Sequence, residues 1–227
     1  MITVDEALKL LRAEAVPEAV EEMAAHHKTE REILGIRVPV ITEMTQDWRH
    51  ELDLEARLAF AAGLWESGIF EARIAAAKLL VQARIRPDDQ EVWALITSWL
   101  PDLDCWALSD HLAEAGSRRL SADPSRLDEV EAWLKSPHSW TRRAALVFTH
   151  PWTKLTHPKA AEIEQRERIL GWAAQLVQDR DWHIQKAIGT WIRDLSKRAP
   201  ERAEAFLQNE GAELKSFARK LARSWMV

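Results

Sequence analysis

The sequence predicts an all-α protein built from stacked pairs of helices, and three observations lead to this prediction. Nearly every long segment repeats apolar residues at spacings of three, four or seven, which is typical of helices with one buried face. Proline beside polar residues separates these segments. No run alternates apolar and polar side chains over the length of a strand, and the nearest candidate, Val38 to Thr42, contains Pro39.

The predicted helices can be followed along the chain. The first strong periodicity covers 64–83, and the next, 92–100, predicts a largely buried helix that ends at Pro101. The same pattern predicts further helices at 126–135, 139–149, 162–177, 182–198, 201–208 and 212–225. Interruptions are expected at Pro87-Asp88-Asp89, Asp123-Pro124-Ser125, Ser136-Pro137 and Ala199-Pro200-Glu201.

Length and composition favour one globular domain over residues 1–227. A chain of this length with 47% hydrophobic residues can bury a sizeable core. The single cysteine, Cys105, excludes a disulfide framework and fits a reducing compartment. No apolar run approaches a membrane span, and the N-terminus lacks the order of a signal peptide. The histidines show no metal-ligand spacing. We therefore expect a cytoplasmic protein with no membrane segment, metal or cofactor.

Three segments share a scheme that indicates internal repeats. In each, an aromatic ring or histidine is followed three residues later by Arg or Lys and then by small apolar residues: Phe70 to Ala75, Trp140 to Ala145 and His183 to Ile188. The spacing fits irregular two-helix repeats with one repeat skipped. Stacked helix pairs form a curved solenoid, and the basic residues Arg73, Arg143 and Lys186 would line its concave face. The alternatives are an ordinary helical bundle and arginines that only cap neighbouring helices.

Charge is distributed unevenly along the chain. The net charge is −5 overall, but residues 1–134 carry −12 and residues 135–227 carry +7. A basic half within an acidic chain favours a nucleic-acid partner. The last predicted helix carries Lys215, Arg219, Lys220 and Arg223, whose spacing suits a phosphate-binding stripe as well as a solvated face.

Four motifs connect the chain to a known family: Leu34-Gly35-Ile36-Arg37-Val38-Pro39, Cys105-Trp106-Ala107-Leu108-Ser109-Asp110, Trp140-Thr141-Arg142-Arg143-Ala144-Ala145 and Ile184-Gln185-Lys186-Ala187-Ile188-Gly189. Together they resemble the AlkD-type DNA glycosylases, HEAT-like repeat proteins that remove alkylated purines. The resemblance implies a HEAT-like helical solenoid with a concave basic face. It also implies that the chain works as a monomer on double-stranded DNA carrying alkylated bases, without a cofactor.

The resemblance further implies which residues form the site. Trp106 and Asp110 match the family's active-site tryptophan and aspartate, and Arg143 matches an arginine that faces DNA beside the lesion. Lys186 and Arg193 would hold phosphates.

One position departs from the family pattern. The family's second active-site tryptophan falls on Thr190, and Trp191 follows it. On a helix, an offset of one residue turns a side chain by about 100°. Either Trp191 reaches the site by a local shift, or one wall of the lesion site is missing. A position that is Tyr in some family members falls on His26.

The chemistry required is simple. Alkylation at N3 or N7 makes a purine cationic and a good leaving group, so little acid catalysis is needed. A carboxylate near C1′ can stabilise the oxocarbenium-like transition state and position water. Trp106 and Asp110 are four residues apart and would share one helix face. The structural alternatives are a core tryptophan and a surface aspartate.

The resemblance therefore implies a monofunctional alkylpurine DNA glycosylase with Asp110 as its catalytic carboxylate. Two alternatives stay open. One is a non-catalytic protein of the same fold that binds damaged or branched DNA, which Thr190 would suit. The other is a protein-binding helical scaffold whose acidic half contacts a basic partner.

Overall fold

The structure is a computed structural model that describes residues 2–226. Within this range every regular element is an α-helix or a short 3-10 helix, so the all-α prediction is confirmed. The chain divides into two compact units, Met1–Ala122 and Asp123–Val227. A single domain over residues 1–227 stays a prediction. In the described residues no helix combines the length and apolar character that crossing a bilayer requires.

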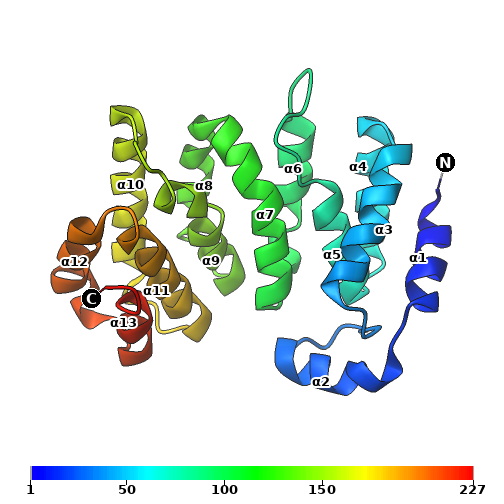
Figure 1. The fold of residues 1–227 in the computed structure, drawn as a ribbon, viewed down its shortest axis with the longest axis horizontal. Helices are drawn as coiled ribbons and strands as arrows, with labels where there is room; N and C mark the ends of the chain where they lie inside the picture. Colours follow the sequence, from blue (N-terminus) through cyan, green and yellow to red (C-terminus); the bar gives the residue numbers. More distant parts are fainter. Residues whose placement is uncertain (1, 227) are drawn as a thin grey trace. The chain divides into compact units, whose positions relative to one another are not determined.

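The first unit contains seven α-helices within its described residues (Figure 1). Their bounds are α1 Val4–Ala13, α2 Pro17–His27, α3 Val38–Glu51, α4 Leu54–Glu66, α5 Phe70–Leu79, α6 Gln90–Ser98 and α7 Trp106–Ala122, with the 3-10 helix η1 Leu100–Asp102 before α7. Helix α5 contacts α3, α4 and α7, and nearly all of its side chains are buried. Helix α6 packs on α7. The unit is thus organised around α5 and α7, each with a partner helix.

A glycine turn corrects the prediction of one continuous helix over 64–83. Helix α4 ends at Glu66 and α5 begins at Phe70. Between them Gly68 has φ +75°, a conformation that side chains other than glycine rarely adopt. Apolar periodicity continues across the turn because α5 and the last two turns of α4 both carry buried apolar residues, so periodicity alone did not show the break.

The second unit contains six α-helices within its described residues. Their bounds are α8 Leu127–Trp133, α9 Ser139–Val147, α10 Ala160–Leu176, α11 Trp182–Ser196, α12 Pro200–Gln208 and α13 Ser216–Ala222, with 3-10 helices η2 Pro124–Arg126, η3 His150–Thr153 and η4 Glu210–Glu213. Helix α8 packs on α9, and α10 packs on α11. Helix α11 also contacts α9 and α13. Gly189 makes the second contact close, because a Cβ there would lie 2.7 Å from the Ala218 carbonyl oxygen.

This arrangement confirms the helical-repeat prediction. The three similar segments form the starts of α5, α9 and α11, each of which contacts both the helix it is paired with and a helix of a neighbouring pair. Helix α7, which begins at Trp106, is the skipped repeat. The charge asymmetry also follows the units: residues 123–227 carry 18 Lys and Arg against 14 Asp and Glu. A concave basic face stays a prediction.

Candidate functional site

Trp106 and Asp110 lie on the first two turns of α7, in the first unit. The helix follows the proline-containing 3-10 turn η1 and a short connection. The indole of Trp106 is half-buried and the Asp110 side chain is exposed one turn later. The shared helix face predicted from their spacing is therefore a face that solvent, or a ligand, can reach at Asp110.

Two histidines from the end of α2 pack against Trp106. The ring centroid of His26 lies 5.4 Å from that of Trp106, edge-on, and the ring of His27 lies 5.1 Å away. His27 also contacts Phe70, the first residue of α5, at 4.8 Å. We call His26, His27, Phe70 and Trp106 the aromatic cluster. It brings His26, which falls on the family's tyrosine position, beside the candidate active-site tryptophan.

A buried glutamate holds the loop that follows α2. Glu71 on α5 is completely buried, and its carboxylate accepts hydrogen bonds from the backbone N–H groups of Leu34, Gly35 and Ile36. Gly35 has φ +82°, and a Cβ there would lie 2.2 Å from the Val16 carbonyl oxygen. The Leu34-Gly35-Ile36 motif thus connects α5, through the Glu71 carboxylate, to Val16 at the start of α2. Sequence reasoning missed Glu71.

Burial keeps two histidines near Asp110 uncharged at neutral pH. The pKa of His111 is lowered to about 4, chiefly by burial and further by Lys78 and His27, while Asp110 opposes the shift. Burial also lowers the pKa of His27, with His26 adding to the effect. These imidazoles therefore do not place positive charge beside Asp110 at pH 7.

The basic residue of the first repeat does not line an open face, which corrects our expectation for Arg73. Its side chain is buried, and its guanidinium donates to the carbonyl oxygens of Trp65 and Asp102. The guanidinium also lies 4.5 Å from the centroid of the Trp65 ring. Arg73 thus caps the ends of neighbouring elements, as the structural alternative proposed.

The corresponding residues of the second unit differ in exposure. Arg143 on α9 is buried, with its guanidinium 5.7 Å from the Trp140 ring. Lys186 on α11 is exposed, with its ammonium 5.1 Å from the Trp182 ring. Lys186 is therefore the repeat cation that a DNA phosphate could reach directly.

Thr190 and Trp191 lie on the regular helix α11 and differ in burial. The helix runs without a break from Trp182 to Ser196, so no local shift moves the second residue into the place of the first. Trp191 is completely buried in the core of the unit, whereas Thr190 is half-buried. Of the two alternatives left open by the sequence, the burial of the Trp191 ring does not favour the one in which this ring reaches the site by a local shift.

Other predicted DNA contacts already have partners within the second unit. Arg193 is half-buried, pairs with Asp194 at 2.9 Å and lies 4.4 Å from the Trp225 ring centroid. Along the C-terminal stripe, three cations contact acceptors within the unit: Lys215 to the Arg180 carbonyl, Arg219 to the Ala212 carbonyl and Arg223 to the Glu204 carboxylate.

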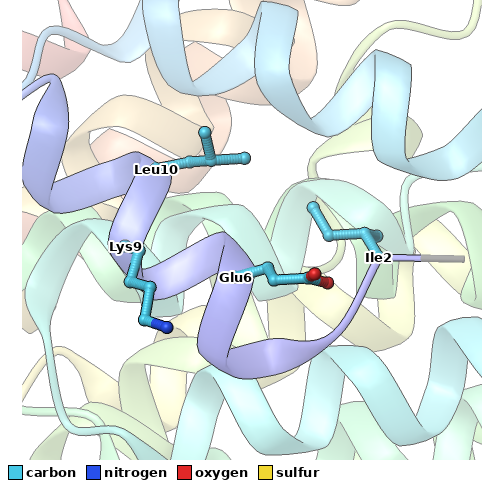
Figure 2. A pocket seen from close by; sticks show the side chains of 4 residues that line it. All are labelled: Ile2, Glu6, Lys9 and Leu10. Carbon is cyan, nitrogen blue, oxygen red and sulfur yellow. The ribbon is translucent and has the colours of Figure 1, made fainter.

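The candidate residues fall in both units, with Trp106 and Asp110 in the first and Arg143, Lys186, Thr190, Trp191 and Arg193 in the second. A separate pocket lies beside α1, lined by Ile2, Glu6, Lys9 and Leu10 (Figure 2). It includes none of the candidate residues, and its carboxylate, Glu6, accepts hydrogen bonds from Thr3. Across residues 2–226, no three His, Cys, Asp or Glu side chains are grouped so as to hold a metal ion.

Comparison with known proteins gives a family and a fold. A family model described as DNA alkylation repair enzyme matches residues 7–226. A structure described as a predicted DNA alkylation repair enzyme from Enterococcus faecalis is 19% identical, with a TM-score of 0.77 over 94% of this chain and 97% of that chain. AlkD2 from Streptococcus mutans is 20% identical, with a TM-score of 0.64 over 91% and 98%.

A third structure, smu.31 from Streptococcus mutans UA159, is 22% identical, with a TM-score of 0.63 over 84% of this chain and 93% of that chain. At these identities the likeness shows the helical fold. No curated protein sequence matches the chain.

Proposed function

Because the chain belongs to the DNA alkylation repair enzyme family, we propose that it is a monofunctional DNA glycosylase acting on positively charged N3- or N7-alkylated purines. It would work as a cytoplasmic monomer on double-stranded DNA without a cofactor. The observation that carries the proposal is the exposed Asp110 carboxylate, one helical turn from the half-buried Trp106.

The proposed reaction is hydrolysis of the bond between C1′ and the purine nitrogen. The electron pair of that bond leaves with the cationic base, which becomes neutral. The Asp110 carboxylate stabilises the positive charge that develops on the sugar and holds a water molecule. Water adds to C1′, its proton passes to the carboxylate, and an abasic site remains.

The surroundings of Asp110 suit a cationic lesion. Burial lowers the pKa values of His27 and His111, so neither imidazole adds positive charge at neutral pH. Lys78 is the cation that acts electrostatically on His111. The indole of Trp106 supplies an aromatic face, which favours a nearby cation by about 0.5–2 kcal/mol. Negative charge and an aromatic surface thus occur together on α7.

In the second unit, we propose that Lys186 binds a DNA phosphate and that Thr190, which stands where the family has a tryptophan, also contacts DNA. Arg143 and Arg193 would act from more buried positions, next to Trp140 and Asp194 respectively. Since Trp191 is completely buried, we give it no contact with DNA.

A second candidate function follows from the same position. Because Thr190 leaves the site without the second tryptophan, a protein of this family that binds damaged DNA but does not release bases is the alternative. It predicts salt-sensitive DNA binding, because neutralised phosphates release counterions, together with no base release.

The test is release of free 7-methylguanine and 3-methyladenine from methylated duplex DNA. We expect the wild type to release base and Asp110→Asn to release none while still binding DNA. Glu114→Gln, which removes an exposed carboxylate one turn further along α7, is the matched control and should retain activity. Equal release by wild type and Asp110→Asn would contradict the proposal. No release by either, with DNA binding retained, would favour the second candidate.

A further inference from the structure

Four rings form a continuous row on the second unit. They come from the first turns of three helices that pack in succession: Trp140 on α9, Trp182 and His183 on α11, and Phe217 on α13. Their centroids are separated by 4.5 Å from Trp140 to His183, 4.9 Å from His183 to Trp182 and 5.4 Å from Trp182 to Phe217. We call these residues the ring row.

The ring row is exposed to solvent at Trp182. The Trp182 side chain is 48% exposed, yet its ring lies nearly parallel to that of Phe217, with 16° between the planes. Trp191 and Trp172 of the same unit are fully buried. The exposure of Trp182 is therefore not a general property of the tryptophans in this unit. An exposed indole already stacked on a second ring is a surface on which a further flat ring can stack.

The row carries positive charge at regular positions. The repeat scheme of an aromatic residue followed three residues later by a basic one extends to Phe217 and Lys220 on α13. Residues three apart share a helix face. Lys186 and Lys220 are both exposed, and the Lys186 ammonium lies 5.1 Å from the Trp182 ring.

The nearby carboxylates are already engaged. Asp181 caps α11 by accepting hydrogen bonds from the backbone N–H groups of His183 and Ile184. Asp179 pairs with Arg142 at 2.8 Å. On α11 and α13 themselves, Lys186 and Lys220 are the exposed charged side chains three or four residues after the two rings, and their charge complements a polyanion.

We propose that the Trp182–Phe217 pair is a stacking site for an unpaired nucleobase of a DNA strand, with Lys186 and Lys220 binding the adjacent phosphates. Exposed aromatic rings interleaved with cations are the usual means of holding single-stranded nucleic acid. This proposal rests on the proposed function in one respect, which is that the ligand is DNA. The bases that it concerns are unpaired ones outside a duplex.

The test compares two DNA duplexes of the same length, one blunt and one with a single-stranded overhang of about five nucleotides that contains 2-aminopurine. The wild type should bind the overhang duplex about tenfold more tightly and should quench the 2-aminopurine fluorescence. Trp182→Leu, which keeps an apolar side chain at this exposed site, should lose both effects. Trp182→Phe, which keeps a ring, should retain most of each.

Trp225→Leu is the matched control, because Trp225 is 45% exposed in the same unit but lies outside the ring row. It should keep the preference for the overhang. Equal affinity of the wild type for both duplexes, or equal weakening of both by Trp182→Leu, would overturn the proposal. Overhang preference without base release would contradict only the glycosylase function, and base release without overhang preference would contradict only the ring-row proposal.

Discussion

Replacing Glu71 by glutamine should loosen the loop that follows α2, the helix whose last two residues, His26 and His27, belong to the aromatic cluster. Glu71 is completely buried and accepts from Leu34 N at 2.9 Å, Gly35 N at 2.8 Å and Ile36 N at 3.2 Å. The glutamine is nearly the same size, so its effect reports hydrogen bonding rather than packing.

The expected loss in the free energy of unfolding is about 3–5 kcal/mol. A hydrogen bond to a charged group is worth about 1.5–3 kcal/mol, and one between neutral groups about 0.5–1.5 kcal/mol. In Glu71→Gln the remaining oxygen can serve Gly35 and Ile36 as a neutral acceptor, but the new NH₂ group faces the Leu34 N–H. Two buried donors then lack an acceptor, which costs about 1–3 kcal/mol each.

Urea denaturation of the whole chain, followed by circular dichroism, measures this change. We expect the midpoint to fall by about 1–2 M, given a urea slope of about 3 kcal/mol per M, the upper end of the usual range, for a chain of this size. Hydrogen exchange by mass spectrometry should show faster exchange of the backbone amides at 34–36. The control is Glu66→Gln on α4, whose side chain is exposed and whose replacement should change stability by less than about 0.5 kcal/mol.

The reasoning would be refuted if Glu71→Gln and Glu66→Gln had the same midpoint and the amides at 34–36 stayed protected. Such a result would mean that the buried carboxylate contributes little to holding the loop.

Two further predictions concern stability. Because the pKa of His111 is about 4 in the folded chain and about 6.5 when unfolded, the unfolded state binds the proton first as pH falls. The free energy of unfolding should therefore fall between pH 6.5 and 4, by at most about 3 kcal/mol, and less in His111→Asn, as measured by urea denaturation across this range. Gly189→Ala should lower the melting temperature, because its Cβ would lie 2.7 Å from the Ala218 carbonyl oxygen. Gly171→Ala on α10, where a Cβ meets nothing within 4 Å, should raise it by about 2–4 °C.

Identical pH dependence in wild type and His111→Asn would contradict the first of these predictions. If Gly189→Ala melted at or above the temperature of Gly171→Ala, the close approach of α11 to α13 would be wrong.

Periodicity predicted the helices well and their breaks less well. The proline boundaries were correct: α12, for example, begins at Pro200, where proline lacks the N–H that a first turn leaves unused. The turn at Gly68 was missed, because α4 and α5 are both apolar on most sides and the pattern runs through the turn.

Repeat position predicted helix placement but not the environment of each basic residue. Arg73 and Lys186 hold equivalent places in their helices, yet the first is buried against two carbonyl groups and the second is exposed. The difference depends on which helix ends lie nearby in the fold, and a local sequence pattern carries no information about that.

The site could be predicted in part. Helix geometry correctly indicated that Thr190 and Trp191 point in different directions, since α11 is regular through both. Glu71 was missed although it lies in a helix whose residues, apart from Glu71, Arg73 and Lys78, are all apolar, a pattern that indicates a buried polar contact. Its partners lie 35–37 residues earlier in the chain, which is why they could not be predicted.

The most direct test of the glycosylase account separates chemistry from binding on one substrate. We would measure the single-turnover rate constant of base release and the Kd for a duplex containing a single N7-methylguanine, with wild type and Asp110→Asn. We expect the rate constant of Asp110→Asn to be at least about 100-fold lower than that of the wild type, the loss usually seen when one group that stabilises transition-state charge is removed. Its Kd should be unchanged or slightly lower. An unchanged rate constant, or a loss of rate explained entirely by weaker binding, would contradict the glycosylase account.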